Sequence, residues 1–278
     1  MNVLRALRTL GRPPKPTSTM SLEQARRSGL APPVDWQPPP RDGVAEIART
    51  GRVFGRMLVT MAIDLARNGK PTRDSTSTAG YAEVQAACRE QARAIGIDVT
   101  VRGLERVPAS GGLVFMWNQT SHLDHLLLPI AIPRPFHVTY NNEVRRFPIY
   151  GRYLATSDHF WIDRTDEAQW RKQVATAADR VRDGACVLIS PEGTRSWDGR
   201  LLPMKRGAFV LARAAGRPIV CVTVCGARAC LPRGRAGIRP GPVTIELSKP
   251  IPTDTPGLEE HVVETFESAL SGNKPDRG

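Results

Sequence analysis

From residue 97 onward, short apolar runs alternate with longer segments in which apolar residues recur every three or four positions. The short runs have the length of buried strands, and the longer segments have the spacing of amphipathic helices. This alternation is typical of α/β proteins. We expect strands at Ile97–Val101, Leu113–Met116, Phe136–Thr139, Ala185–Ile189, Ile219–Thr223 and Val243–Leu247. We expect helices at 81–95, His122–Ile130, Thr165–Arg182, Met204–Ala215 and Leu258–Ser271.

The first 80 residues follow a different pattern. Residues 1–42 are rich in Pro, Arg and Ser, and we expect a mobile arm there. Residues 43–69 gather apolar side chains on one side of a helix and also carry several arginines. Such a helix lies on an anionic membrane or packs against the protein's own core, and the pattern favours neither. A polar linker at 70–80 therefore separates residues 1–80, an arm plus amphipathic helix, from an α/β domain at 81–278.

Size and charge narrow the class of protein. A chain of 278 residues suits one large domain with an N-terminal extension. The net charge of +12 favours anionic partners such as nucleic acid, an anionic membrane or CoA-type ligands. Aromatic residues make up only 6% of the chain and no zinc-finger spacing is present, so we expect no nucleic acid partner. Five cysteines without framework spacing indicate reduced thiols in a cytosolic protein, and we expect no metal site.

The segment Trp117-Asn118-Gln119-Thr120-Ser121-His122-Leu123-Asp124-His125 stands between a predicted strand and a predicted helix. Ser121 and Asp124 have the spacing of a capping box, with Ser121 as the N-cap residue. The free amides of a helix N-terminus also favour anions. The two interpretations are compatible, because one arrangement can cap the helix and face a ligand.

A second polar segment, Ser190-Pro191-Glu192-Gly193-Thr194-Arg195-Ser196, directly follows the predicted strand that ends at Ile189. The carboxyl ends of strands are where α/β sheets hold ligands. Gly193 allows close approach of the main chain to a phosphate, and Arg195 can bind one bidentately. Lys205 and Arg206 begin the next helix and add positive charge, although a solvated helix face explains them equally well.

These segments occur in an order that resembles the PlsC-type lysophospholipid acyltransferases, which include 1-acylglycerol-3-phosphate acyltransferases. The first segment is similar to the family motif Asn-His-x-Ser-x-x-Asp, followed by Phe147-Pro148-Ile149-Tyr150-Gly151 and by Ile162-Asp163-Arg164. The block from Pro191 to Ser196 and the apolar run from Pro218 to Val222 complete the series, which covers roughly residues 97 to 250. The resemblance implies a glycerolipid acyltransferase fold, with a mixed, mostly parallel sheet flanked by helices and an N-terminal helical extension.

The resemblance also implies roles for individual residues. In that family the histidine of the first motif removes the proton from the acceptor hydroxyl, and the aspartate orients it. The aspartate corresponds to Asp124. In the family, the residues that are implicated in holding the acceptor's phosphate correspond to Arg164, Glu192, Gly193, Thr194 and Arg195. Lys205 lies beside them in the sequence.

The histidine position is occupied by Gln119, whose amide does not titrate near neutral pH. Three interpretations stay open. His122 or His125 replaces the missing base, with His122 the better placed; the chain binds lipid with impaired catalysis; or Asp124 or Glu192 acts as base. We therefore place Gln119, His122 and Asp124 in the expected catalytic site.

The resemblance implies transfer of an acyl group from acyl-CoA or acyl-ACP, as co-substrate, to a lysophospholipid acceptor. No metal or redox cofactor is expected, because attack on a thioester needs only a base, an oxyanion donor and positioning. No apolar run approaches the ~18 residues of a membrane span, and no secretory signal is recognisable. We therefore expect a cytoplasmic protein, peripheral on the inner face of an anionic membrane.

Overall fold

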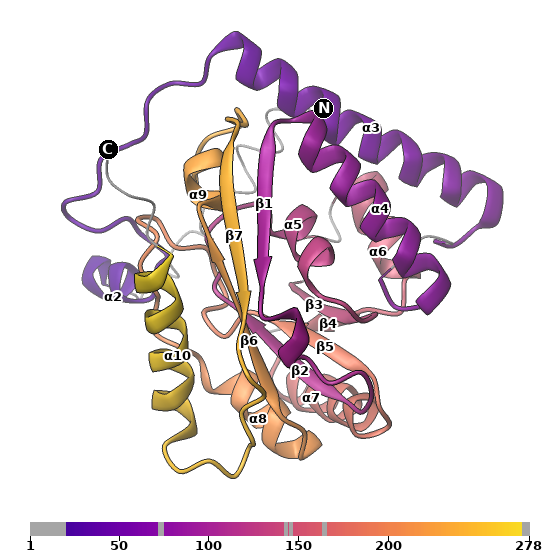
Figure 1. The fold of residues 1–278 in the computed structure, drawn as a ribbon, viewed down its shortest axis with the longest axis vertical. Helices are drawn as coiled ribbons and strands as arrows, with labels where there is room; N and C mark the ends of the chain where they lie inside the picture. The colour runs from indigo at the N-terminus through magenta and orange to yellow at the C-terminus, as the bar shows by residue number, and fades with distance from the viewer. Residues whose placement is uncertain (1–20, 72–74, 142–143, 145–146, 163–165, 274–278) are drawn as a thin grey trace.

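The computed structural model describes residues 21–71, 75–141, 144, 147–162 and 166–273. At its centre is a seven-stranded sheet in the order β1-β7-β6-β2-β5-β3-β4 (Figure 1). The strands are β1 (Ile97–Arg102), β2 (Leu113–Trp117), β3 (His137–Asn141), β4 (Phe160–Ile162), β5 (Cys186–Ile189), β6 (Ile219–Cys225) and β7 (Gly241–Leu247).

The strand directions confirm the predicted mixed, mostly parallel sheet. β2 pairs in parallel with β5 and β6, and β3 pairs in parallel with β5 and β4. β7 is antiparallel to β6, and β1 is parallel to β7. Because β2, β5 and β6 run side by side in one direction, their carboxyl ends meet at the same edge of the sheet.

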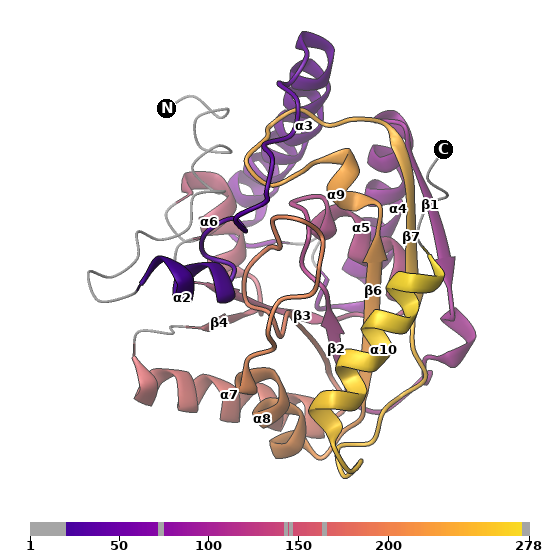
Figure 2. The ribbon, with the colours of Figure 1, turned by 90° about the vertical axis from the view of Figure 1, so that its left-hand side faces the viewer.

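Helices cover both faces of this sheet. The described helices are α2 (Leu22–Arg27), α3 (Val44–Asn68), α4 (Thr78–Ala94), α5 (Asp124–Ala131), α6 (Pro148–Thr156), α7 (Glu167–Arg182), α8 (Arg206–Ala215), α9 (Ala227–Cys230) and α10 (Leu258–Gly272), with a 3-10 turn, η1, at Leu104–Arg106. Figures 1 and 2 show α7, α8 and α10 on one side of the sheet and α3, α4 and α5 on the other.

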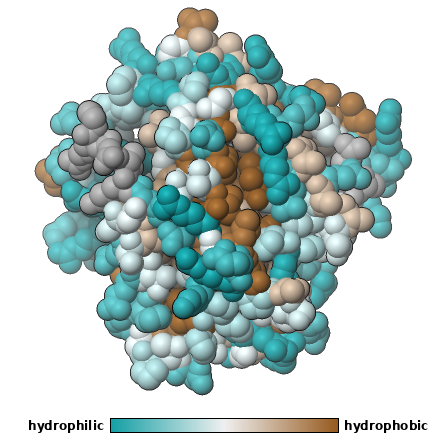
Figure 3. Space-filling model, viewed as in Figure 1, coloured by the Kyte–Doolittle hydropathy of each residue, from teal (hydrophilic) through white to brown (hydrophobic). Residues whose placement is uncertain are grey.

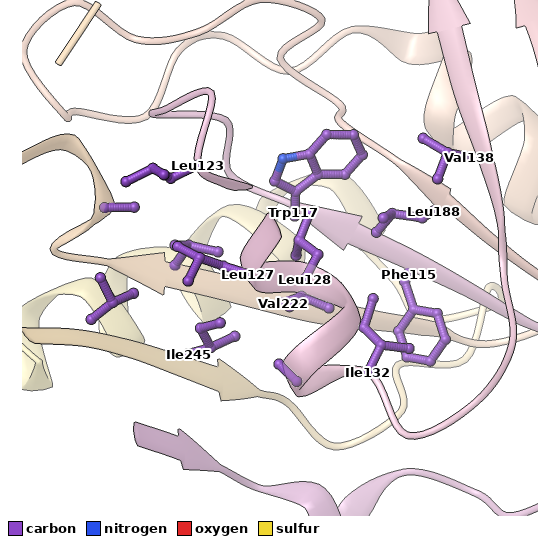
Figure 4. Close-up of a cluster of buried hydrophobic side chains, with 14 of the residues drawn as sticks. Phe115, Trp117, Leu123, Leu127, Leu128, Ile132, Val138, Leu188, Val222 and Ile245 are labelled. Carbon is purple, nitrogen blue, oxygen red and sulfur yellow. The ribbon is translucent and has the colours of Figure 1, made fainter. Parts of the chain in front are cut away.

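Alternate side chains of the central strands enter two separate cores, as the period of two along a strand requires. On β2, Phe115 and Trp117 belong to the core beneath α4 and α5, whereas Val114 and Met116 belong to the core beneath α7, α8 and α10. Figure 4 shows Phe115 and Trp117 together with Leu127, Leu128 and Ile132 of the α5 region. β2 is therefore buried on both faces, which explains its continuous apolar sequence.

The predicted elements from residue 81 onward are present, but the structure also contains β4, α6 and α9, which were not predicted. The residues of β4 and α6 were assigned to motifs. Pro148 occupies the first turn of α6, where its missing N–H leaves no hydrogen bond unmade. In addition, α5 begins at Asp124 instead of His122.

The described part of the N-terminal arm differs from the mobile segment that the sequence predicts. Residues 21–42 contact the body of the protein, and Ala236 N–H donates to Asp42 Oδ2 over 3.1 Å. Trp36 Nε1 donates to the carbonyl oxygen of Trp197 over 3.2 Å. The remainder of the arm, residues 1–20, lies outside the described residues.

The interpretation that residues 43–69 pack against the protein's own core is confirmed for one part of α3. In its first half Thr50 and Val53 are buried, and Ile238 N–H donates to Thr50 Oγ1 over 2.9 Å. In its second half Val59 and Ile63 are 58% and 46% exposed. The first half therefore packs on the protein's own core, and the second half exposes apolar surface.

No helix among the described residues is long and apolar enough to cross a membrane. Apolar surface nevertheless gathers in a band on one face, between β1 and α4 and over α5, with hydrophilic side chains on both sides (Figure 3).

Candidate active site

The two polar segments that the sequence singles out meet at the edge of the sheet where β2 and β5 end. Gln119 N–H donates to Glu192 Oε1 over 2.8 Å, and Ser196 N–H donates to the carbonyl oxygen of Gln119 over 2.8 Å. The segments are about seventy residues apart in the chain. Parallel pairing of β2 with β5 is what brings them together.

Asn118 fixes the start of the first segment to the end of β6. Its side-chain oxygen accepts from Val224 N–H over 2.7 Å, and its side-chain nitrogen donates to Val224 O over 3.0 Å. The side chain is 1% exposed. The amide thereby continues the hydrogen-bond ladder past the end of β2, a role that a side chain with both a donor and an acceptor can fill.

Of the two bonds of the expected capping box at Ser121, the structure has one, from Ser121 N–H to Asp124 Oδ2, and α5 begins later than the capping box predicts. The residue before α5 is Leu123, which makes no side-chain cap. Ser121 Oγ instead donates to Leu231 O over 2.8 Å and accepts from Leu123 N–H over 3.1 Å. The turn before the helix therefore uses the hydroxyl, which moves the start of α5 to Asp124.

Asp124 holds this turn with one carboxylate oxygen. Its Oδ2 accepts from Thr120 N–H and Ser121 N–H, over 3.0 and 3.1 Å. Its Oδ1 is buried without a hydrogen-bond partner among the described residues. Trp117 Nε1 approaches the same carboxyl, but its geometry falls short of a hydrogen bond.

The environment of Asp124 makes it a proton acceptor near neutral pH. Burial raises the pKa of Asp124 to about 7, against the two backbone N–H donors and the positive charge of Arg195, which lower it. A carboxyl with such a pKa is poised to take a proton at physiological pH.

Glu192 braces the two segments. Oε1 accepts from Gln119 N–H, and Oε2 accepts from Leu202 N–H over 2.7 Å. Burial raises the pKa of Glu192 to about 8, and the nearby Asp124 raises it further, whereas the two N–H donors lower it. Both oxygens are thus engaged with main chain, so this residue fixes the two segments and the loop at Leu202 relative to one another.

The histidines are placed differently from each other. His122 Nε2 is buried without a hydrogen-bond partner among the described residues. Burial, followed by the charges of Arg195, His125 and Arg233, lowers the pKa of His122 well below its ordinary value. His125 is solvent-exposed and stacks edge-on to Trp117, with ring centroids 6.4 Å apart. The imidazole of His122 is therefore neutral at pH 7, and His125 belongs to an aromatic cluster.

The side chain of Gln119 is half-buried, and among the described residues no hydrogen bond joins its amide to Asp124. The main chain of this residue is fixed by hydrogen bonds with Glu192 and Ser196. Its side-chain amide makes no hydrogen bond among the described residues.

The expected phosphate-binding residues lie in one loop, with one exception. Gly193 has a φ of +67°, which glycine adopts without strain, and Thr194 beside it is half-buried. Arg195 is 7% exposed and interacts electrostatically with Asp124. Lys205 is exposed at the N-cap of α8, and its N–H donates to Pro191 O over 2.8 Å. Arg164 lies outside the described residues.

Sequence reasoning missed Arg233, which the structure brings to this site. It is 3% exposed, and its Nη1 donates to Arg195 O over 2.5 Å. The one available signal was its place in Leu231-Pro232-Arg233-Gly234, a turn that follows the β6 region. From the local sequence alone, an arginine in a surface turn cannot be distinguished from an arginine in a functional site.

Among the described residues no group of His, Cys, Asp and Glu side chains could hold a metal ion. What the site does contain is a carboxyl group with a pKa near 7, two buried guanidinium groups and a neutral imidazole. Such a set can remove a proton from a hydroxyl and hold an anion.

Comparisons with known proteins agree with this chemistry. Residues 98–225 match the family model described as Acyltransferase. A 1-acyl-sn-glycerol-3-phosphate acyltransferase from Chlamydomonas reinhardtii is 35% identical over 156 residues, which cover 55% of this chain and 47% of the relative. One from Cocos nucifera is 29% identical over 187 residues, covering 66% and 59%. The chain thus spans about half the length of the curated relatives that it matches.

A solved structure has the same fold. The crystal structure of the 1-acyl-sn-glycerophosphate acyltransferase PlsC from Thermotoga maritima superposes with a TM-score of 0.71, at 20% identity, covering 84% of this chain and 98% of that one. The predicted fold is thereby confirmed.

Proposed function

We propose that this protein is an O-acyltransferase of the family whose model residues 98–225 match. It moves a fatty acyl group from acyl-CoA or acyl-ACP to the hydroxyl of a lysophospholipid such as 1-acylglycerol-3-phosphate. The observation that carries this proposal is the hydrogen bond between Gln119 and Glu192, because it joins the segment of Asp124 to the segment of Arg195, and these two side chains interact electrostatically. The names of the relatives support the same acceptor.

In the proposed reaction the acceptor hydroxyl oxygen attacks the thioester carbonyl carbon. The C–S bond then breaks, an ester forms, and the thiol leaves with the proton that a base removed from the hydroxyl. The step needs a base, an anion subsite and exclusion of water, without a metal or redox cofactor. Arg195 binds the acceptor's phosphate in this proposal, and the loop of Gly193 and Thr194 lines the subsite.

Two residues compete for the role of base, and the geometry favours Asp124. Its Oδ1 has no hydrogen-bond partner in the described part of the chain, and its pKa is raised to about 7. His122 would become a cation beside Arg195 and Arg233, and the same charges already lower its pKa. A base whose pKa lies near the working pH is the more effective one.

A second candidate function follows from Gln119. General-base assistance is typically worth about 10²–10⁴-fold in rate. If neither Asp124 nor His122 reaches the acceptor hydroxyl, the same pocket binds the lysophospholipid without turning it over. The lack of a bond between Gln119 and Asp124 among the described residues favours this alternative, because the pair that normally transfers the proton is not formed.

We further propose that the protein acts at the inner surface of an anionic membrane from the cytoplasmic side. The exposed Val59 and Ile63 of α3, with Arg52, Arg56 and Arg67 exposed on the same helix, support this location. Apolar side chains enter the interface while arginines contact anionic headgroups.

The decisive experiment measures acceptor-dependent thiol release from acyl-CoA and from acyl-ACP with the full-length protein. Wild type is compared with Asp124→Asn and His122→Gln, each checked for folding by circular dichroism. Turnover that is lost in Asp124→Asn and retained in His122→Gln supports acyl transfer with Asp124 as base. Binding of 1-acylglycerol-3-phosphate without any turnover by wild type would establish the second candidate.

A further inference from the structure

The N-terminal strap, residues 21–42, is bound to the loop that contains Arg195 and Trp197. Gly29 O accepts a hydrogen bond from Trp197 Nε1 over 3.1 Å. Trp36 and Trp197 meet edge to face, with ring centroids 5.0 Å apart. Figure 2 shows α2 of the strap beside the orange loop that follows β5. A segment outside the family match at 98–225 therefore covers the phosphate-binding loop.

Arg233 provides a further connection between the strap and this loop. Its Nη1 donates to Gly29 O over 2.9 Å and to Arg195 O over 2.5 Å. Its Cζ lies 4.0 Å from the centroid of the Trp197 ring. A planar guanidinium can stack on an indole and donate in its own plane at once, which an ammonium cannot do.

The strap approaches the loop closely at Gly29. Gly29 has a φ of +71°, and a Cβ there would stand 2.3 Å from Leu202 Cδ1. Leu202 N–H is the donor to Glu192 Oε2. The strap therefore packs against the same loop residues that hold Glu192 in place.

The charge of Arg233 adds to that of Arg195. Arg233 is buried, and after burial itself the charge of Arg195 is what lowers the pKa of Arg233. These two buried guanidinium groups repel each other. An anion between or beside them would lower their electrostatic energy. A phosphate monoester carries close to two negative charges at neutral pH, and a neutral headgroup carries none.

We propose that Arg233 is a positioning residue for the acceptor's phosphate. It fixes the main chain of Arg195 against the strap and supplies a second positive charge to the phosphate subsite. This inference rests on the proposed function of the Arg195 loop. It makes the strap part of the acceptor site, although the strap carries none of the family's motifs.

The test measures the dissociation constant of 1-acylglycerol-3-phosphate by calorimetry, and KM and kcat for the same acceptor, with the full-length protein. Arg233→Met is expected to weaken binding by about 10- to 100-fold, the scale of one charge-assisted hydrogen bond, and to raise KM more than it lowers kcat. Arg233→Lys is expected to restore part of the affinity, because it retains the charge. Monoacylglycerol, which lacks the phosphate, is expected to bind Arg233→Met and wild type alike.

Two further variants separate positioning from general stability. Trp36→Phe retains an aromatic ring and removes the N–H that bonds to Trp197 O, so a several-fold weaker acceptor affinity is expected. Arg239→Met is the control. Arg239 lies in the same loop as Arg233 and bonds to Pro40 O of the strap and to Glu46 of α3. It is expected to lower the melting temperature without changing the acceptor's dissociation constant.

Wild-type affinity in folded Arg233→Met would overturn the inference and leave the proposed acyl transfer intact. If that variant does not fold, unchanged affinity in both Arg233→Lys and Trp36→Phe overturns it instead. Wild type that neither binds nor acylates 1-acylglycerol-3-phosphate would overturn the proposed function together with the inference.

Discussion

The main-chain N–H of Gln119 donates to Oε1 of Glu192 over 2.8 Å, and this bond joins the two segments of the candidate site. Because Ser196 N–H returns a bond to Gln119 O, residue 119 is held from both sides through its main chain. Its side chain takes no part in this brace. Position 119 can therefore change its side chain without moving the rest of the site.

The first prediction concerns Gln119→His. The substitution places an imidazole five residues before Asp124, whose Oδ1 has no partner among the described residues. We expect an increase in kcat of up to about 10²-fold, because the restored pair supplies general-base assistance. The measurement is thiol release with acyl-CoA and 1-acylglycerol-3-phosphate.

The double variant Gln119→His with Asp124→Asn serves as the control for this gain. It is expected to lose most of the increase, since the imidazole then lacks its carboxylate. A kcat equal to wild type in folded Gln119→His would contradict the prediction.

The second prediction concerns pH. If Asp124 is the base, kcat/KM rises with pH and is half-maximal near pH 7, where burial places the pKa of Asp124. The carboxyl must be ionised to take the proton, so activity falls as pH drops below that value. If His122 were the base, its lowered pKa would keep kcat/KM constant from pH 6.5 to 8. A pH profile of wild type and His122→Gln distinguishes the two.

The third prediction concerns Asn118→Ala. The substitution leaves both Val224 N–H and Val224 O without their partner in a buried setting. We expect a loss of about 2–6 kcal/mol in the free energy of unfolding, from about 1–3 kcal/mol for each of the two unpaired groups. Urea denaturation measures it. Asn68→Ala, which removes an exposed bond to Asp64, is expected to cost below about 0.5 kcal/mol.

The fourth prediction concerns α3. Val59 and Ile63 are one helical turn apart and both exposed. The pair of substitutions Val59→Asp and Ile63→Asp is expected to reduce binding to vesicles that contain anionic lipid by about tenfold or more, through lost burial and charge repulsion. Vesicle flotation measures this.

Thr60→Asp is the control, because Thr60 is an exposed polar residue between them. Its substitution adds one of the two negative charges and removes no apolar side chain. Point variants suit this question better than truncation, since the first half of α3 is bonded to the 236–239 loop. Equal flotation of all three proteins would remove the support for membrane docking through this helix.

The periodicity of the sequence predicted most of the strands and helices and their order. The mostly parallel sheet, and the roles of the two segments in one site, were implied by the resemblance to the acyltransferase family. The sequence did not predict the strap or Arg233. Gly29 and Trp36 lie in a Pro-rich segment with no periodicity, and their contacts with Trp197 span more than 160 residues. It also placed the start of α5 too early, since the hydroxyl of Ser121 bonds to distant Leu231.

The pairing of β1 with β7 has a consequence for how the chain folds. β1 is an edge strand whose partner, β7, begins about 140 residues later, at Gly241. Loop closure over that distance is slow, because its entropic cost precedes any gain from pairing. During synthesis β1 leaves the ribosome long before β7 exists. β1 therefore stays without its partner strand until β7 is synthesised. β6 also lacks one of its two neighbouring strands until then, because β7 lies between β1 and β6.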